Sequence, residues 1–164
     1  MAEVAYYDTC VFELQWNSAH EQSAACQALV DVPRIRWTVA FGEISMSEAP
    51  IREWLDAFEI QCALQGVAAR RVRADEAATV ARHRRQLGKR LRQLGLGAYD
   101  WKHLCGAAAV SADALVTDDR DFWDPAAKRT GQRPTDGPVC RAAWDEFGIT
   151  IERPSTAAPR LRAL

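Results

Sequence analysis

Acidic side chains stand where predicted strands end and the following helices begin. In a parallel α/β sheet these ends lie along one edge, so carboxylates from distant parts of the chain can meet there. Gathered carboxylates repel one another unless a cation offsets their charge, and Mg²⁺ or Mn²⁺ takes oxygen ligands together with phosphate oxygens. The pattern therefore predicts a divalent-metal site suited to phosphodiester chemistry, with candidate ligands Asp8, Glu43, Glu48, Asp100, Asp118, Asp119 and Asp121.

The segments that would position these acids alternate between strand and helix patterns. Apolar and β-branched runs predict strands over 4–7, 35–41, 67–72, 114–117 and 149–151. Apolar residues at intervals of three and four predict helices within 10–31, 48–64, 75–94, 100–109 and 139–147. Because parallel neighbours need crossover helices, we expect an α/β three-layer sandwich around a mainly parallel sheet of about five strands. One domain should span residues 1–152, followed by a mobile C-terminal tail over 153–164.

Composition narrows the class of protein. The 164 residues suffice for one domain, and 48 % hydrophobic with 26 % charged residues excludes wholesale disorder and fibrous architectures. A net charge of −1 gives no global basic field, so any nucleic-acid surface must be local. Five scattered cysteines without a C-x-x-C spacing argue against a disulfide framework or zinc knuckle. With no signal-peptide pattern and no apolar run of membrane-spanning length, we expect a cytoplasmic protein without membrane contacts.

Four segments occur in the order typical of one protein family. Asp8-Thr9-Cys10-Val11 is similar to an opening D-T/S-x-hydrophobic motif, and the segment 41–48 is similar to S-x-I-T-L-x-E. The segment 100–109 matches D-x-x-H-x-x-A-A, and 114–122 is similar to L-V-T-x-D-x-D-F. Over nearly its whole length the chain resembles the PIN-domain nucleases, and in size and layout most closely the VapC-type toxin ribonucleases.

This resemblance implies a metal-dependent endoribonuclease, the toxin of a type II toxin-antitoxin pair. One or two Mg²⁺ or Mn²⁺ ions would activate water and offset charge on the phosphate, leaving a 5′-phosphate and a 3′-hydroxyl. Because Glu43 is a second carboxylate in the second motif, either it or Glu48 is the second acid. The implied catalytic and metal-binding residues are Asp8, Glu48, Asp100 and Asp119, supported by Thr9, Glu43, Thr117 and Asp121.

Partner surfaces are suggested by charge and aromatic residues. Basic residues with helical spacing at Arg82, Arg85, Lys89 and Arg92 predict contacts to RNA phosphates, or else a solvated or antitoxin-binding face. The expected apolar stripe opposite them consists of Val80, Leu87, Leu91 and Leu94. Six tryptophans exceed what a small core requires, although core packing is their default role. The family resemblance implies a cognate antitoxin protein and a homodimer.

Three alternative functions come from the same pattern. A PIN-fold module could bind RNA without cleaving it, and a PIN nuclease could act in RNA processing outside any toxin-antitoxin pair. An aspartyl-phosphate phosphatase would need a second aspartate two residues after Asp8, where Cys10 stands.

His103 would be a neighbour of the acids and not a ligand, and Cys10 and Cys105 would be small packing residues beside the site.

Overall fold

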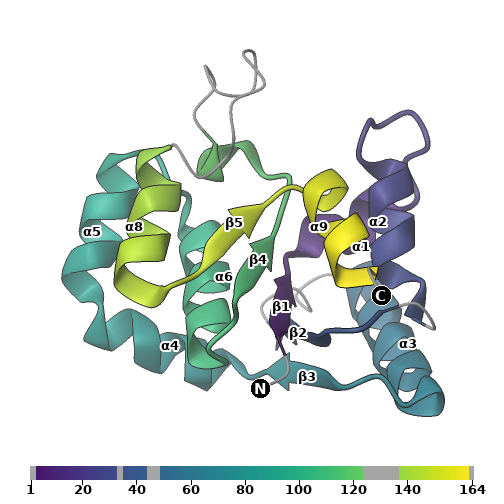
Figure 1. The fold of residues 1–164 in the computed structure, drawn as a ribbon. Helices are drawn as coiled ribbons and strands as arrows, with labels where there is room; N and C mark the ends of the chain where they lie inside the picture. Colours follow the sequence, from purple (N-terminus) through teal and green to yellow (C-terminus); the bar gives the residue numbers. More distant parts are fainter. Residues whose placement is uncertain (1–2, 33–34, 44–48, 124–136, 163–164) are drawn as a thin grey trace.

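A parallel five-stranded sheet forms the centre of the computed structural model, which describes residues 3–32, 35–43, 49–123 and 137–162 (Figure 1). Its strands are β1 (Val4–Tyr7), β2 (Thr38–Gly42), β3 (Ala69–Val72), β4 (Ala114–Val116) and β5 (Thr150–Glu152). The helices are α1 (Thr9–Leu14), α2 (Ser23–Val30), α3 (Ala49–Gln65), α4 (Ala74–His83), α5 (Arg85–Gln93), α6 (Ala98–Ala109), α8 (Pro138–Phe147) and α9 (Pro154–Arg162). A 3₁₀ turn, η3, covers Arg120–Phe122. Within the described ranges no helix combines the length and apolar character needed to cross a membrane.

The strand order β3-β2-β1-β4-β5 places a change of direction at the middle of the sheet. From β1 the chain adds β2 and β3 on one side, then returns to add β4 and β5 on the other. Tyr7 at the end of β1 pairs with Phe41 of β2 and with Val116 of β4. Ligands of open α/β sheets bind beyond the carboxyl ends of the strands at such a switch point, so the ends of β1 and β4 are where a site is expected.

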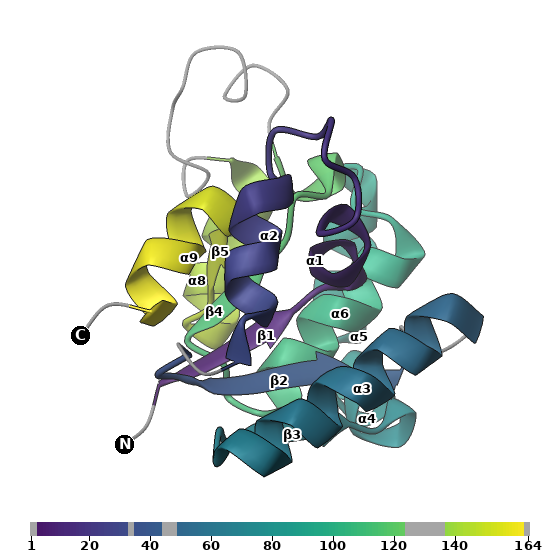
Figure 2. The ribbon, with the colours of Figure 1, turned by 90° about the vertical axis from the view of Figure 1, so that its right-hand side faces the viewer.

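Both faces of the sheet are covered by helices, as Figures 1 and 2 show. Since side chains alternate along a strand, Tyr6 and Leu115 pack among α4, α5, α6 and α8, whereas Tyr7 and Val116 pack among α1, α2, α3 and α9. Each face carries its own buried hydrophobic cluster. The expected three-layer α/β sandwich with a parallel five-stranded sheet is confirmed.

The prediction of a single helix over 75–94 is wrong. The helix is interrupted at Arg84, whose backbone angles, φ −107° and ψ 30°, are not helical. Two shorter helices result, and each presents its own small or apolar residues to α6. On α5, Gly88 lies so close to Trp101 that a Cβ atom there would be 2.8 Å from the indole ring. Leu94, expected on the buried stripe, is 47 % exposed because it follows the end of α5.

Within the segment 153–164, which the sequence predicts to be a mobile tail, the structure contains a helix. Residues 154–162 form α9, which packs against α2. Ala157, Ala158 and Leu161 recur at helical spacing and are buried, and the Arg160 guanidinium lies 4.2 Å from the centre of the Trp37 ring. The short, Pro-containing apolar pattern of this segment is too weak a helix signal by itself, and burial against α2 supplies the stabilisation.

Candidate metal centre

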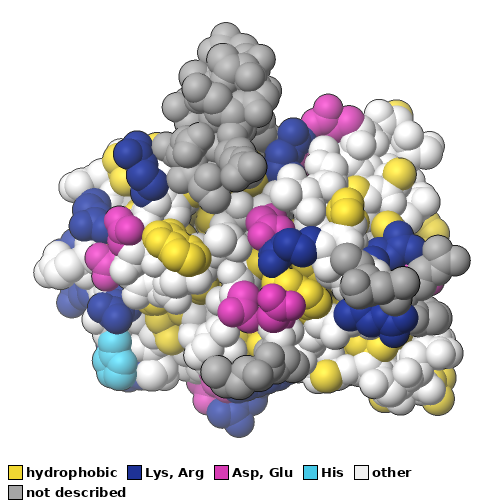
Figure 3. Space-filling model, in the orientation of Figure 1, with side chains coloured by type: hydrophobic (Ala, Val, Ile, Leu, Met, Phe, Trp, Pro, Cys, Tyr) yellow, Lys and Arg dark blue, Asp and Glu magenta, His cyan; other side chains and the backbone are white. Residues whose placement is uncertain are grey.

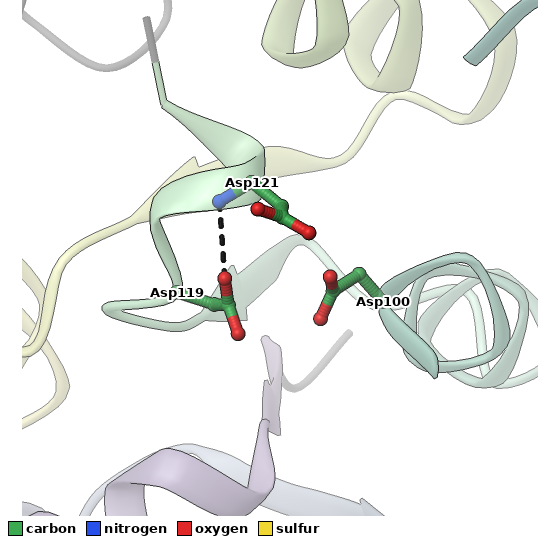
Figure 4. Close-up of side chains that lie close together, drawn as sticks. All are labelled: Asp100, Asp119 and Asp121. Carbon is green, nitrogen blue, oxygen red and sulfur yellow. Dashed lines mark hydrogen bonds between the residues drawn. The ribbon is translucent and has the colours of Figure 1, made fainter. Parts of the chain in front are cut away.

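Three carboxylates converge at the carboxyl end of β4. Asp100 lies in the first turn of α6, while Asp119 and Asp121 lie on the turn that follows β4. One oxygen from each lies within 4.8 Å of the others, and Figure 4 shows Asp100 pointing toward the other two. The backbone N–H of Asp121 donates to Asp119 Oδ1 at 3.0 Å, which fixes the turn. Such a set of oxygen donors could hold a divalent cation.

The close approach of α6 to this turn depends on Gly97, the residue that precedes α6. A Cβ atom at this position would lie 2.9 Å from Asp100 Oδ2 and 3.0 Å from Asp121 Oδ2. Any larger residue would therefore push the two carboxylates from their places. In the sequence, Gly97 indicates only the end of the preceding helix.

The electrostatics of the cluster favour a bound cation. Burial, then the negative charges of Asp119, Asp8 and Asp121, raise the pKa of Asp100 to about 7. Among the described residues, no Lys or Arg forms an ion pair with Asp100, Asp119 or Asp121. A bound proton or cation would reduce the repulsion among these carboxylates. The cluster is therefore suited to binding a cation.

Asp8 follows β1 and lies beside this cluster, with its side chain held from two sides. Asp8 is buried, and its Oδ2 accepts a hydrogen bond from the Thr117 hydroxyl at 2.6 Å. The same hydroxyl accepts the backbone N–H of Asp119 at 3.0 Å. Thr117 thus connects the acid after β1 with the acid turn after β4.

A second set of contacts to Asp8 comes from His103, three residues after Asp100 on α6. Its Nε2 lies 3.2 Å from Asp8 Oδ1 and 3.3 Å from the Thr9 hydroxyl, and its Nδ1 lies 3.1 Å from the Tyr6 hydroxyl. Since a carboxylate only accepts, Nε2 donates to Asp8, and in a neutral imidazole Nδ1 then accepts from Tyr6. Burial, and next the charge of Asp8, raise the pKa of Tyr6 well above its usual range, so the phenol keeps its proton.

Sequence reasoning missed this role of Tyr6, because a tyrosine within an apolar strand is typical of a core residue. A glycine makes room for it: a Cβ atom at Gly106 would lie 2.8 Å from the Tyr6 hydroxyl oxygen. Tyr6, His103 and Asp8 therefore form a buried hydrogen-bonded chain that fixes one orientation of the Asp8 carboxylate.

Asp118, the remaining acid after β4, points away from the cluster. Its Oδ1 accepts from Arg153 Nε at 2.8 Å, and its Oδ2 lies 3.6 Å from His20 Nε2. Arg153 also pairs with Glu21. The Cys10 thiol accepts the backbone N–H of Asp118 at 3.2 Å, so Cys10 orients the acid turn in addition to filling space. Arg153 and His20 could not be assigned to this position from the sequence.

Of the two candidates for the second acid, the structure describes Glu43. Glu43 Oε2 accepts the backbone N–H of Ala74 at 3.1 Å, at the first residue of α4. Negative charge is favoured at a helix start, which gives Glu43 a structural role. Glu48 lies outside the described residues.

The basic residues predicted to contact RNA lie on two helices, because of the break at Arg84. Arg82 is on α4, and its Nη2 donates to the Thr79 hydroxyl at 3.2 Å. Arg85, Lys89 and Arg92 follow one another at intervals of four and three along α5, which places them on one face, and all three are exposed.

Comparison with known proteins bears on the fold. A solved structure of VapBC2 from Rickettsia felis, bound to a DNA fragment from its promoter, superposes with a TM-score of 0.50. The identity is 14 %, and the match covers 92 % of this chain and 98 % of the other. The chain has a PIN-like fold. No protein-family model matches the sequence, and a search of curated proteins finds no relative. Within this PIN-like fold, Asp8 and Asp119 follow the neighbouring strands β1 and β4, and Asp100 faces them from α6.

Proposed function

We propose that this protein is a metal-dependent endoribonuclease. The observation that carries the proposal is the convergence of Asp100, Asp119 and Asp121 at the switch point of a PIN-like sheet, beside the buried Asp8. The raised pKa of Asp100 supports it, because a site that repels its own charges gains most from a cation.

Asp8, Asp100 and Asp119 would hold one or two Mg²⁺ or Mn²⁺ ions, with Glu48 as the fourth acid and Asp121 in support. When bound, the ion would act as a Lewis acid that activates water and offsets charge on the phosphate. The protein's own residues hold the metal-binding carboxylates in fixed orientations. Thr117 and His103 hold both oxygens of Asp8, and the Asp121 N–H holds Asp119, so the ligands need little rearrangement when the ion binds.

We further propose that the protein is the toxin of a toxin-antitoxin pair, acting in the cytoplasm and forming a homodimer. The PIN-like fold shared with VapBC2 supports an antitoxin partner. A cavity of about 180 Å³ between α1, α2 and α3 could receive an apolar side chain from a helix of that partner. Its lining includes Phe12, Trp16 and Trp54, and the Trp16 side chain is 67 % exposed.

The test is cleavage of a mixed cellular RNA pool by the parent protein and by Asp119→Asn. Each is assayed with Mn²⁺ and with a chelator, and product ends are read by sequencing. Discrete cuts that need both Mn²⁺ and Asp119, with 5′-phosphate ends, are expected. RNA that is bound but never cut would refute the nuclease and favour a non-catalytic RNA-binding module. Cuts confined to precursor RNA, without toxicity on expression, would favour a processing nuclease over a toxin.

A further inference from the structure

A basic cavity lies away from the acid cluster, between the start of α5 and the end of α8. Its volume is about 410 Å³. Figure 3 shows Lys and Arg side chains gathered along this side of the molecule, with acidic side chains among them. The residues that line it are His83, Arg84, Arg85, Gln86, Leu87, Arg90 and Glu146.

Two arginines of this cavity converge on one carboxylate. Arg84 Nη1 lies 3.7 Å from Glu146 Oε2, and Arg90 Nη2 lies 3.5 Å from Glu146 Oε1. The Arg84 guanidinium is also held over the Phe147 ring at 5.7 Å from its centre. Both ion pairs are longer than ordinary N–H···O hydrogen bonds, so N–H groups of both guanidiniums keep capacity for a second anion.

The charge of this cavity and the arrangement of its guanidiniums favour a phosphate group as the ligand. Three arginines and one glutamate leave the cavity positive, and planar guanidiniums that meet from two directions match phosphate oxygens. Arg84 and Arg90 are 49 % and 58 % exposed, so a polymer backbone can reach both.

The position of α5 connects this cavity with the acid cluster. The cavity lies at the start of α5, and the chain beyond its end leads through Gly97 to Asp100. Nine residues of helix span about 13 Å, and the exposed Arg85, Lys89 and Arg92 follow this path. We infer that Arg84 and Arg90 bind the phosphodiester backbone of single-stranded RNA at a distance from the cut, with Glu146 weakening that contact. This inference rests on the proposed ribonuclease function.

The experiment measures RNA binding by fluorescence anisotropy in Asp119→Asn protein with a chelator present, so that nothing is cut. Against a single-stranded RNA of about sixteen nucleotides, Arg84→Gln and Arg90→Gln should each lower affinity about three- to tenfold and reduce the salt slope by about one. Glu146→Gln should raise affinity. Arg141→Gln on the exposed side of α8 is the matched control and should change neither quantity.

Unchanged affinity and salt slope in both arginine variants would overturn the inference. Tighter binding of poly-glutamate than of RNA would also overturn it and would assign the cavity to an acidic protein. Since binding is measured without metal, failure of the proposed cleavage reaction would leave this result intact, and the two failures can be told apart.

Discussion

Replacing Asp100 by Asn should change stability in opposite directions with and without metal. The Asp100 carboxyl is 7 % exposed, and burial with the charges of Asp119, Asp8 and Asp121 raises its pKa from an ordinary 3.8 to about 7. A group with a higher pKa in the folded than in the unfolded protein binds its proton more tightly when folded. Its effect on stability is therefore absent well below about pH 4, and the folded state loses stability as pH rises toward and through about 7.

The magnitude follows from the size of the shift. About three pKa units at about 1.4 kcal/mol each give a destabilisation of at most about 4 kcal/mol at about pH 8. Asparagine removes the charge but keeps the volume, and it does not recover the whole penalty because part of the burial cost remains. We expect a gain of about 1–3 kcal/mol in the free energy of unfolding, which raises Tm by about 2–10 °C.

Asp100→Asn should also reduce the stabilisation that the protein gains from bound metal. A ligand at about one hundred times its Kd stabilises the parent by about 2.7 kcal/mol. Without the Asp100 carboxylate one ligand is lost, and most of this gain should disappear. In the parent the gain from Mn²⁺ should grow between about pH 6 and pH 8, because protons compete for Asp100 below its pKa.

The assay is thermal unfolding of the parent, Asp100→Asn and the control Asp145→Asn, at about pH 6 and pH 8, with chelator and with Mn²⁺. Asp145 is an exposed acid on α8, so its replacement should leave both Tm and the metal response near parental values. The reasoning is refuted if Asp100→Asn lowers the metal-free Tm equally at both pH values, or if it keeps the full response to Mn²⁺.

Three further predictions concern the residues around the acids. Tyr6→Phe removes the donor to His103 Nδ1 and should weaken Mn²⁺ binding about tenfold, and ¹⁵N NMR of the histidine ring should show the loss of a single tautomer. Gly97→Ala should lower cleavage at least about tenfold with little change in metal-free Tm, because the new methyl group displaces two carboxylates, and normal activity would contradict this account. Glu48→Gln should abolish RNA cleavage. Glu43→Gln should lower the free energy of unfolding by only about 1 kcal/mol, because it weakens the hydrogen bond at the start of α4. Loss of cleavage in Glu43→Gln with normal cleavage in Glu48→Gln would instead make Glu43 the second acid.

The alternation of strand and helix patterns was enough to predict the layers of this protein. Short apolar runs such as Val4–Tyr7 can be buried on both faces only inside a sheet covered by helices, and the parallel order follows from the helices between them. The positions of Asp8 and Asp119 at strand ends follow from the same pattern, because carboxyl ends of parallel strands share one edge.

The break at Arg84 and the burial of α9 could not be predicted in this way. Both involve surfaces supplied by distant segments. Near the break, α5 packs on Trp101 of α6, and α9 packs on α2 and on Trp37, the residue before β2. Helical periodicity describes one segment, and it does not show where a neighbouring helix requires a change of direction.

The sequence by itself determined that acids gather at one edge of a parallel sheet, because a helix between successive strands makes those strands run in the same direction. Only the tertiary structure decided which acids face one another. Asp118 and Asp119 are adjacent in the chain, yet Arg153 draws Asp118 away, while Thr117 and the Asp121 N–H hold Asp119 beside Asp100. A side chain's direction is set by partners that lie far from it in sequence, and those partners meet only in the folded protein.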